Sequence, residues 1–316
     1  MNKKFAFERR LPLTFGALLI GLTIAGCAKH DDHLSFAKPE DAVAALIGAA
    51  RKDDVATLKQ IAGPGAEAVL SSGDPVADKQ ARAHFLAQYD EKHTLVPDGE
   101  DKMDLQVGAD DWPMPIPLVH RDGHWYFDGA AGADEIVYRR VGRNELGAIA
   151  VCHGFVDAQN EYASKDRDGE GAGVYAQKLV SDPGTHNGLY WPTAEGEEPS
   201  PVGEFVADAA AEGYRAGAAA PYHGYRYRQL FRQGENANGG AKEYFERGVL
   251  ANGFALVAWP AEYGVSGVMT FIVDQDGVVF QKDLGEDTDA TVDAMQSFDP
   301  DSTWTAVVDE SAGEAS

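Results

Sequence analysis

Cysteine is nearly absent from this chain of 316 residues, which contains only Cys27 and Cys152. A framework of disulfide bonds needs several paired cysteines, so the sequence excludes a small fold held together by disulfides. Cys152 lies in the apolar stripe of an expected helix, where burial raises the pKa of a thiol and lowers its reactivity. We therefore expect Cys152 to be a buried hydrophobic side chain rather than a nucleophile.

Basic residues are scarce as well. The chain has 27 lysines and arginines against 51 aspartates and glutamates, which gives a formal net charge of −24. Removal of residues 1–26, which contain four basic residues and one acidic residue, would change this charge to −27. Such a surface repels phosphate backbones, so we expect no nucleic-acid partner. The charge favours solubility and by itself specifies no ligand.

The common catalytic motifs are also missing. Ser266 stands in G-V-S-G rather than G-x-S-x-G and precedes an expected strand, so we expect no nucleophile elbow. No glycine-rich loop has the spacing of a phosphate-binding motif. His153 and Asp157 share a helix face at the spacing of half a metal site, but the other half is missing. These absences favour a protein without catalytic activity.

Long apolar runs are limited to one, from Leu11 to Ile24, which is short for a membrane span. Four basic residues precede it and Ala25-Gly26-Cys27 follow it. A basic start, a short apolar core and small residues before a cysteine indicate a bacterial lipoprotein signal. We expect residues 1–26 to be removed, Cys27 to carry the lipid, and residues 27–35 to form a tether.

The residues after Cys27 bear on location. Ala28 and Lys29 follow it, with no aspartate at the second position. Enterobacterial lipoproteins with this pattern are sorted to the outer membrane, so the resemblance implies that location, on the periplasmic side. We expect contact with the membrane through the lipid alone.

Residues 36–132 are expected to form a small α+β domain. Helices are expected at 39–52, 55–61 and 78–89, followed by strands at 104–107, 116–120 and 124–127. Asp122-Gly123, between two apolar runs, is the strongest short hairpin signal. The segment P-L-V-H-R-D-G-H-W-Y-F-D resembles the closing hairpin of nuclear transport factor two and cystatin domains, which implies a helix-plus-antiparallel-sheet cone.

Residues 133–308 are expected to form a long helix over 133–164 and an antiparallel sheet domain. Phe155 and Val156 lie where the apolar stripe of this helix is widest, so we expect both to be buried. Strands are expected at 222–231, 254–259, 268–273 and 278–282, then a helix at 288–298 and a strand near 304–308. The segment 254–259 is apolar on both faces, which favours a central strand, and 309–316 is expected to be a disordered tail.

Two aromatic segments are candidate parts of a ligand site. Such a stripe with a histidine could bind a sugar or a peptide, and the segment after residue 258 would lie at the end of the sheet. The alternative is aromatic sheet core followed by a structural turn. The candidate residues are Tyr222, His223, Tyr225, Trp259, Glu262 and Tyr263.

One acidic loop resembles the start of a calcium-binding loop. Asp166, Asp168 and Glu170 stand at i, i+2 and i+4, and Gly171 follows. The twelfth position is Gln177, where a bidentate glutamate would be needed. Calcium is the only cofactor that the sequence suggests, and a solvated acidic loop is the alternative.

Four segments resemble the bacterial family DUF2950, and the likeness runs from about Pro39 to Val307. They are E-Y-A-S-K-D-R-D-G-E-G, G-L-Y-W-P, P-Y-H-G-Y-R-Y-R and F-A-L-V-A-W-P-A-E-Y-G-V-S-G-V-M-T-F-I-V-D-Q-D-G-V-V-F. This family has no established activity, so the resemblance implies no catalytic residues. The long helix and the closing T-F-I-V-D-Q-D-G-V-V-F are similar to the globular part of type IV pilins and pseudopilins. The charged segment 138–145 departs from the apolar helix by which pilins polymerise, so this likeness implies a fold and not a filament.

We therefore expect a non-enzymatic binding or scaffolding role in the cell envelope, with an envelope protein or a glycan as partner. The alternative is a hydrolase of cell-wall or carbohydrate material, in which His223 acts with Glu262 or Tyr263. Hydrogen-bond reach between His223 and Glu262 inside one pocket would favour the enzyme, and separate positions would favour binding.

Overall fold

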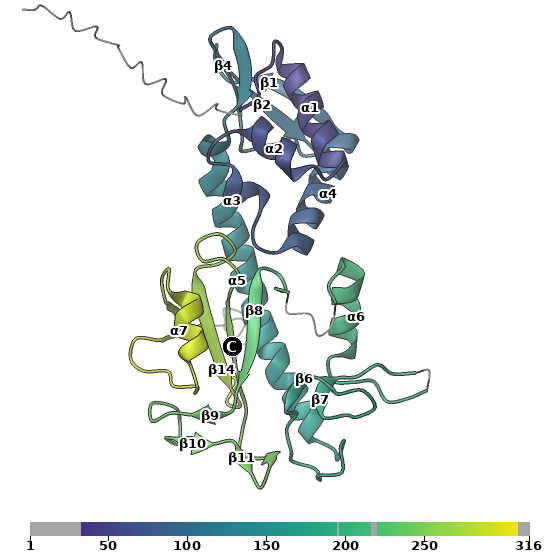
Figure 1. Cartoon of the computed structure of the whole chain (residues 1–316), viewed down its shortest axis with the longest axis vertical. Helices are drawn as coiled ribbons and strands as arrows, with labels where there is room; N and C mark the ends of the chain where they lie inside the picture. Colours follow the sequence, from purple (N-terminus) through teal and green to yellow (C-terminus); the bar gives the residue numbers. More distant parts are fainter. Residues whose placement is uncertain (1–32, 195, 216–219, 309–316) are drawn as a thin grey trace, which may run out of the picture. The chain divides into compact units, whose positions relative to one another are not determined.

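The computed structural model describes residues 33–194, 196–215 and 220–308 (Figure 1). The expected signal peptide, Cys27, residues 27–32 of the expected tether and the tail at 309–316 lie outside the described residues. The described part combines helices with sheets that are mainly antiparallel and do not close into barrels, which confirms the α+β class. Its buried hydrophobic side chains form two clusters, one within residues 36–136 and one within residues 148–307.

The first cluster begins with helices whose starts follow from local sequence. They are α1 (Pro39–Arg51), α2 (Val55–Ala62), α3 (Glu67–Leu70) and α4 (Pro75–Glu91). Pro39 lies in the first turn of α1, where its missing N–H has no helical partner to lose. Asp54 caps α2 by accepting a hydrogen bond from Thr57 N at 3.0 Å. The backbone N–H of Leu34 donates to Gln60 O at 2.8 Å, so the described end of the expected tether is attached to α2.

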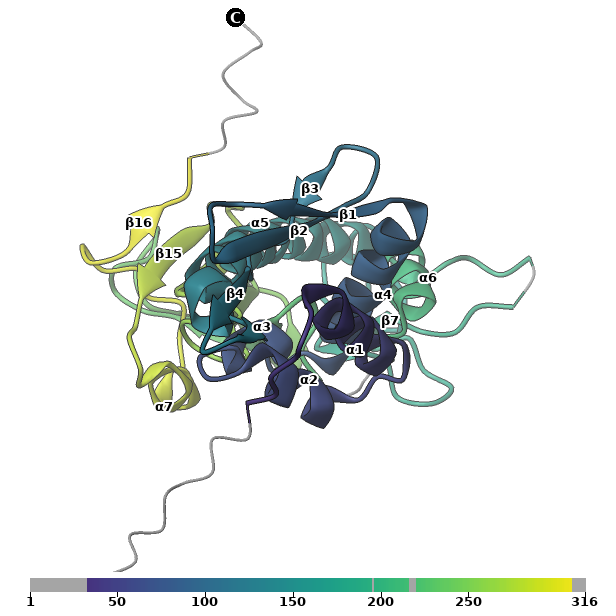
Figure 2. The same ribbon diagram turned by 90° about the horizontal axis from the view of Figure 1, so that it is seen from above.

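An antiparallel sheet completes this cluster. Its strands are β1 (His93–Pro97), β2 (Lys102–Val107), β3 (Trp112–Pro113), β4 (Leu118–Arg121) and β5 (His124–Phe127). The order is β1-β2-β4-β5, and β3 pairs with β2. Asp122 and Gly123 have positive φ values of 52° and 76°, as the tight turn of a hairpin requires. α1 and α2 both contact β5 and lie on the same side of the sheet (Figure 2).

Helix α5 (Gly129–Ala163) begins four residues before the expected start at position 133. A Cβ atom on Gly129 would lie 2.5 Å from Ala62 O, and one on Gly132 would lie 2.2 Å from Pro115 O. The two glycines therefore allow the first turn of α5 to pack against neighbouring backbone. The sequence does not predict this first turn as helical, because glycine has a low helix propensity.

The second cluster lies around a five-stranded antiparallel sheet. Its strands are β8 (Tyr225–Leu230), β13 (Ala255–Pro260), β14 (Met269–Asp274), β15 (Phe280–Asp283) and β16 (Thr305–Ala306), in the order β16-β15-β14-β13-β8. Every residue of β13 is buried, and this strand lies inside the sheet. Phe155 and Val156 of α5 are only 5% and 8% exposed, as expected, and Phe155 packs edge-on against Phe254 with 5.5 Å between ring centroids.

Helices cover both faces of this sheet. α5 contacts β13 and β14, and α7 (Thr288–Ala294) contacts β13. Tyr225 belongs to the same buried cluster as Cys152 of α5, whereas Arg228 donates a hydrogen bond to Val292 O of α7. Side chains alternate along a strand, so these two residues of β8 point to opposite faces. The expected helix over 288–298 ends earlier, at Ala294.

Short elements surround the end of α5 and position the site described below. They are β6 (Lys178–Val180), β7 (Gly188–Tyr190), α6 (Gly203–Glu212), β9 (Arg232–Gln233), β10 (Lys242–Glu243), β11 (Phe245–Glu246) and β12 (Val249–Leu250). β6 and β7 pair in parallel, and β7 contacts α5. The sequence pattern does not predict α6 or β1. β8 begins at Tyr225 rather than at position 222, because residues 222–225 form a tight turn in which His223 has a φ of 50°.

Candidate functional site

Three of the six candidate ligand residues are held by hydrogen bonds within the sheet region. Tyr225 is fully buried and its hydroxyl donates to Met269 O at 2.9 Å. The indole N–H of Trp259 donates to Asp289 Oδ1 at 2.8 Å. The hydroxyl of Tyr263 donates to Asp283 Oδ1 at 3.0 Å. These side chains therefore join strands, turns and α7 to one another.

Tyr222 and His223 lie together, and a different carboxylate accompanies them. The ring of Tyr222 stacks on His223 with 4.1 Å between centroids. His223 Nε2 lies 2.6 Å from Oε2 of Glu212, at the end of α6. No hydrogen bond joins His223 to Glu262 or Tyr263 among the described residues. Glu262 is exposed and lies beside Gly73, with its Oε2 3.5 Å from the place of a Cβ on that glycine.

A buried carboxylate holds the backbone next to His223. Oδ2 of Asp74, which is fully buried, accepts hydrogen bonds from Tyr214 Oη and Gly224 N, both at 2.9 Å. Its Oδ1 accepts from Val76 N and Ala77 N at 3.1 Å each, so the same side chain caps α4. Burial and the neighbouring Asp74 raise the pKa of Tyr214 well above its usual value.

Neither Ser266 nor Cys152, the two possible nucleophiles considered from the sequence, is activated in the structure. No serine, threonine or cysteine side chain in the described part of the chain is hydrogen-bonded to His223. Cys152 is completely buried, and burial raises the pKa of its thiol to about 12. At neutral pH this thiol stays protonated, and the thiolate is the reactive form.

The acidic loop after α5 is closed by its own hydrogen bonds. Oδ1 of Asp166 accepts from Gly169 N at 2.8 Å, and Oδ1 of Asp168 accepts from Glu170 N at 3.3 Å. Within the residues that the structure describes, no three His, Cys, Asp or Glu side chains are arranged to hold a metal ion. The structure thus gives no support to a calcium site at Asp166, Asp168 and Glu170.

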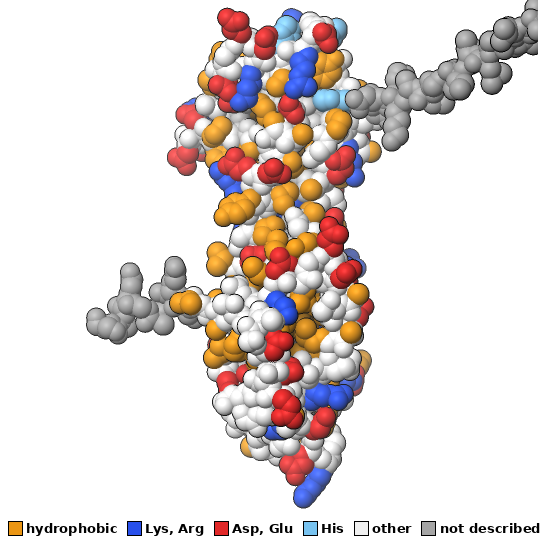
Figure 3. Space-filling model, turned by 90° about the vertical axis from the view of Figure 1, so that its left-hand side faces the viewer, with side chains coloured by type: hydrophobic (Ala, Val, Ile, Leu, Met, Phe, Trp, Pro, Cys, Tyr) orange, Lys and Arg blue, Asp and Glu red, His pale blue; other side chains and the backbone are white. Residues whose placement is uncertain are grey.

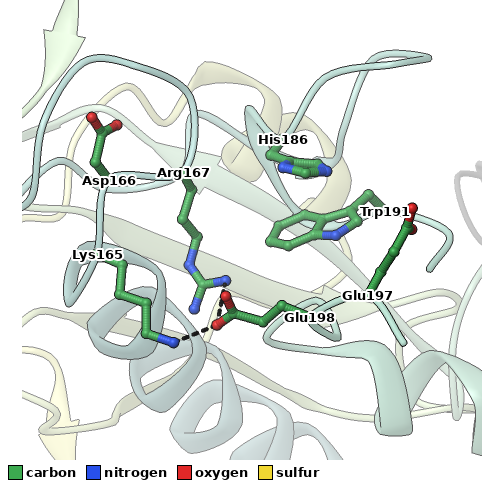
Figure 4. Close-up of a pocket in the computed structure, with 7 residues that line it drawn as sticks. All are labelled: Lys165, Asp166, Arg167, His186, Trp191, Glu197 and Glu198. Atoms are coloured by element: carbon green, nitrogen blue, oxygen red, sulfur yellow. Dashed lines mark hydrogen bonds and ion pairs between the residues drawn. The ribbon is translucent and has the colours of Figure 1, made fainter. Parts of the chain in front are cut away.

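A pocket of about 370 Å³ opens beside this loop (Figure 4). Three separate segments build it: the chain after α5, the residues on either side of β7, and the chain before α6. The residues that line it are Lys165, Asp166, Arg167, His186, Trp191, Glu197 and Glu198.

The centre of the pocket is a contact between Arg167, Trp191 and His186. Trp191 is 5% exposed, and the His186 ring stacks on it with 4.4 Å between centroids. The guanidinium carbon of Arg167 lies 5.6 Å from the centroid of the Trp191 ring, within the range of a cation–π interaction. The Arg167 side chain is also 5% exposed, and it donates to Tyr162 O and Glu161 Oε1 at 3.3 Å each. These contacts fix the positions of both side chains.

The cations of the pocket are neutralised within it. Figure 4 shows Glu198 between the two, with its Oε1 2.5 Å from Lys165 Nζ and 3.5 Å from Arg167 Nη1. The hydrogen bond with Lys165 lowers the pKa of Glu198. Oε2 of Glu197, by contrast, has one hydrogen-bond partner among the described residues, the backbone N–H of Ala194 at 3.0 Å. The pocket can therefore offer acceptors from Glu197 and donors from Lys165 without an unpaired cation at its centre.

Asp166, singled out from the sequence as a candidate calcium ligand, lines this pocket, but the sequence patterns do not predict the pocket itself, because its residues are far apart along the chain. One signal was available. Two of the segments that resemble DUF2950, at 161–171 and 188–192, contain Lys165, Arg167 and Trp191.

The surface has no single acidic centre on the face shown in Figure 3, where carboxylates are scattered among hydrophobic and basic side chains. This distribution is typical of a solvent-exposed surface on which the charges serve solubility. Within residues 33–194, 196–215 and 220–308, no helix combines the length and the hydropathy needed to cross a bilayer.

Comparisons with known proteins give one family. No match to the chain was found among curated proteins or among solved structures. A family described as "Protein of unknown function (DUF2950)" matches residues 33–307, which is most of the chain. The chain therefore belongs to the DUF2950 family.

Proposed function

We propose that this protein is a lipid-anchored binding protein of the bacterial cell envelope. In this proposal Cys27 carries the lipid, the folded part faces the periplasm from the outer membrane, and the protein acts without catalysis. The observation that carries the binding role is the pocket in which Arg167 and Trp191 are already fixed by packing and hydrogen bonds. A site that is ordered before the ligand arrives loses less conformational freedom on binding.

The proposal of a non-enzymatic role rests on two findings. The imidazole of His223 is paired with Glu212 and has no hydroxyl or thiol among its described hydrogen-bond partners; the Tyr214 hydroxyl accepts from the backbone N–H of His223 instead. Cys152 is buried and protonated at neutral pH. Nucleophilic catalysis needs a nucleophile within reach of its base.

The anchor is tested by the variant Cys27→Ala. This variant should lack acylation and leave the membrane fraction, because the acyl chains supply the apolar attachment and an acidic surface supplies none. Metabolic labelling with a radioactive fatty acid and membrane fractionation measure both effects. An unlabelled wild-type protein, together with unchanged fractionation of the variant, would reject the lipoprotein assignment.

The binding role is tested by capture of envelope material on the intact protein in detergent. Wild type should retain a component that His186→Ala loses, because His186 forms the exposed end of the stack on Trp191. His124→Ala is the matched control, since His124 is exposed on β5 and lies outside the pocket. Equal retention by wild type and both variants would reject the pocket as the binding site.

A hydrolase acting on cell-wall or carbohydrate material is the second candidate function. The observation in its favour is the His223–Glu212 pair, because a carboxylate can orient an imidazole as a general base. In this alternative Glu212 takes the role first expected of Glu262 or Tyr263. His223→Ala should then abolish turnover of labelled peptidoglycan and leave capture by the pocket unchanged. No turnover by the wild-type protein would reject the hydrolase.

A further inference from the structure

We infer that the pocket around Trp191 binds a neutral saccharide. This inference rests on the proposed binding function and names the chemical class of the ligand. The volume of about 370 Å³ lies at the lower end of the usual range for small-molecule sites, about 300–1,000 Å³. A short saccharide is a ligand of this size.

The aromatic stack offers a surface for the apolar face of a sugar ring. Trp191 is buried, but His186 is exposed and lies on it nearly parallel, with an interplanar angle of 29°. A sugar ring has a face made of C–H groups, and such a face packs on an aromatic ring. Because Arg167 contacts the Trp191 ring and is itself hydrogen-bonded to Tyr162 O and Glu161, the exposed imidazole lies on a pair of packed side chains.

The polar groups of the pocket are complementary to a ligand that both donates and accepts hydrogen bonds. The indole N–H of Trp191 donates to no acceptor among the described residues, and its nitrogen is not one of the fully buried unpaired side-chain atoms, so a ligand in the pocket can reach it. Glu197 has an oxygen that is not used by the backbone of Ala194 and can only accept. A hydroxyl group can accept from Trp191 and a neighbouring hydroxyl can donate to Glu197. Figure 4 shows Glu197 beside the Trp191 ring.

The charges of the pocket disfavour ionic ligands of either sign. An anion would have to displace Glu198 from Lys165 and Arg167, and it would face Glu197 as well. A cation could pair with Glu197, but it would approach Lys165 and would supply no acceptor to the N–H of Trp191. A neutral polyhydroxyl ligand satisfies the donors and the acceptors while the ion pairs stay intact.

The test is calorimetric titration of the full-length lipidated protein in a detergent that contains no sugar. Three trisaccharide probes differ in charge: N-acetylglucosamine trimer is neutral, glucosamine trimer is cationic and galacturonate trimer is anionic. The neutral trimer should bind at least about tenfold more tightly than either charged trimer, which corresponds to about 1.4 kcal/mol. Trp191→Phe keeps a ring and removes the N–H, so it should weaken the neutral trimer about fivefold to tenfold.

Two further substitutions separate the pocket from the rest of the surface. His186→Ala and Glu197→Ala, both at exposed positions, should each weaken the neutral trimer by about tenfold. The controls His124→Ala and Glu91→Ala replace exposed residues of the same types outside the pocket, and affinity should not change.

Each other outcome overturns the inference in a distinguishable way. Tighter binding of a charged trimer rejects the neutral class. Binding of the neutral trimer that is equal in His186→Ala, Glu197→Ala and wild type rejects the pocket as its site. If no trimer binds while envelope capture still depends on His186, the saccharide inference fails and the proposed binding function stands. If neither measurement depends on His186, both fail.

Discussion

At the scale of single residues, burial changes the titration of one carboxylate in the second sheet. Asp274, at the end of β14, is 2% exposed and accepts hydrogen bonds from Asp276 N and Gln275 Nε2, both at 3.0 Å. Burial raises the pKa of this carboxyl from 3.8 to about 6, although the hydrogen bond from Asp276 N opposes the shift. In the sequence the same residue reads only as the start of an Asp-Gln-Asp-Gly turn.

The raised pKa of Asp274 predicts how stability changes with pH. The folded protein holds this proton up to about pH 6 and the unfolded chain releases it near pH 4, so the carboxyl favours folding less as pH rises between these values. Asp274→Asn removes this titration. The free energy of unfolding of the variant relative to wild type should therefore increase by about 2 kcal/mol from pH 4 to pH 7.

Urea denaturation at the two pH values measures this difference. Any change in the free energy of unfolding that asparagine causes independently of pH cancels in the comparison. Asp122→Asn is the control, because Asp122 is exposed at a turn with positive φ that asparagine also tolerates. A variant difference at Asp274 that is the same at pH 4 and pH 7 would contradict the prediction.

At the scale of secondary-structure elements, α5 shows how one residue type can have opposite effects along a helix. Gly132 lies where a Cβ would be 2.2 Å from Pro115 O, whereas Gly142 has nothing within 4 Å of the place of its Cβ. Both glycines are in helical positions of α5. Glycine weakens a helix interior relative to alanine, so only the first of the two has a packing reason to be glycine.

Alanine substitutions at these two positions should change stability in opposite directions. Gly132→Ala should destabilise the protein by about 1–3 kcal/mol, because the backbone of Pro115 or α5 must move. Gly142→Ala should stabilise it by about 1 kcal/mol through helix propensity. Chemical denaturation of the two variants measures the effects. Stabilisation by both substitutions would mean that the start of α5 does not pack against Pro115.

At the scale of the whole molecule, polar contacts connect the two hydrophobic clusters of the described chain. Asp74 at the start of α4 accepts hydrogen bonds from Tyr214 and Gly224, which are about 140 and 150 residues away in the sequence. Arg140 of α5 donates to Ala68 O and Val69 O at the end of α3. A buried carboxylate with four donors is costly to remove, because each donor then lacks an acceptor.

Removal of Asp74 should therefore cost more than removal of an ordinary helix cap. Asp74→Ala should destabilise the protein by about 3–5 kcal/mol, from the lost cap and from the unpaired donors of Tyr214 and Gly224. Asp54→Ala is the matched control, since Asp54 caps α2 through Thr57 without a contact to the second cluster and should cost about 1 kcal/mol.

Hydrogen exchange at the backbone N–H of Gly224 gives a second measurement. It should become faster in Asp74→Ala and remain unchanged in Asp54→Ala. If the two variants lose the same stability and Gly224 exchanges at the wild-type rate in both, Asp74 does not connect the clusters.

The sequence by itself determined the features that depend on neighbours along the chain. The Asp122-Gly123 hairpin, the proline start of α1, the buried stripe of Phe155 and Val156 and the interior position of β13 all follow from local pattern. Each is specified by turn geometry or by the period of the apolar residues, which a short segment contains completely.

Only the tertiary structure decided which distant side chains meet. His223 pairs with Glu212 rather than Glu262, because the unexpected helix α6 ends beside it. The pocket joins the chain after α5, the residues around Trp191 and the chain before α6, and no pattern of spacing encodes their contact. The early start of α5 likewise depends on the backbone that faces Gly129 and Gly132. Packing between remote segments overrides local propensity because burial and close approach contribute more free energy than the preference of any single residue.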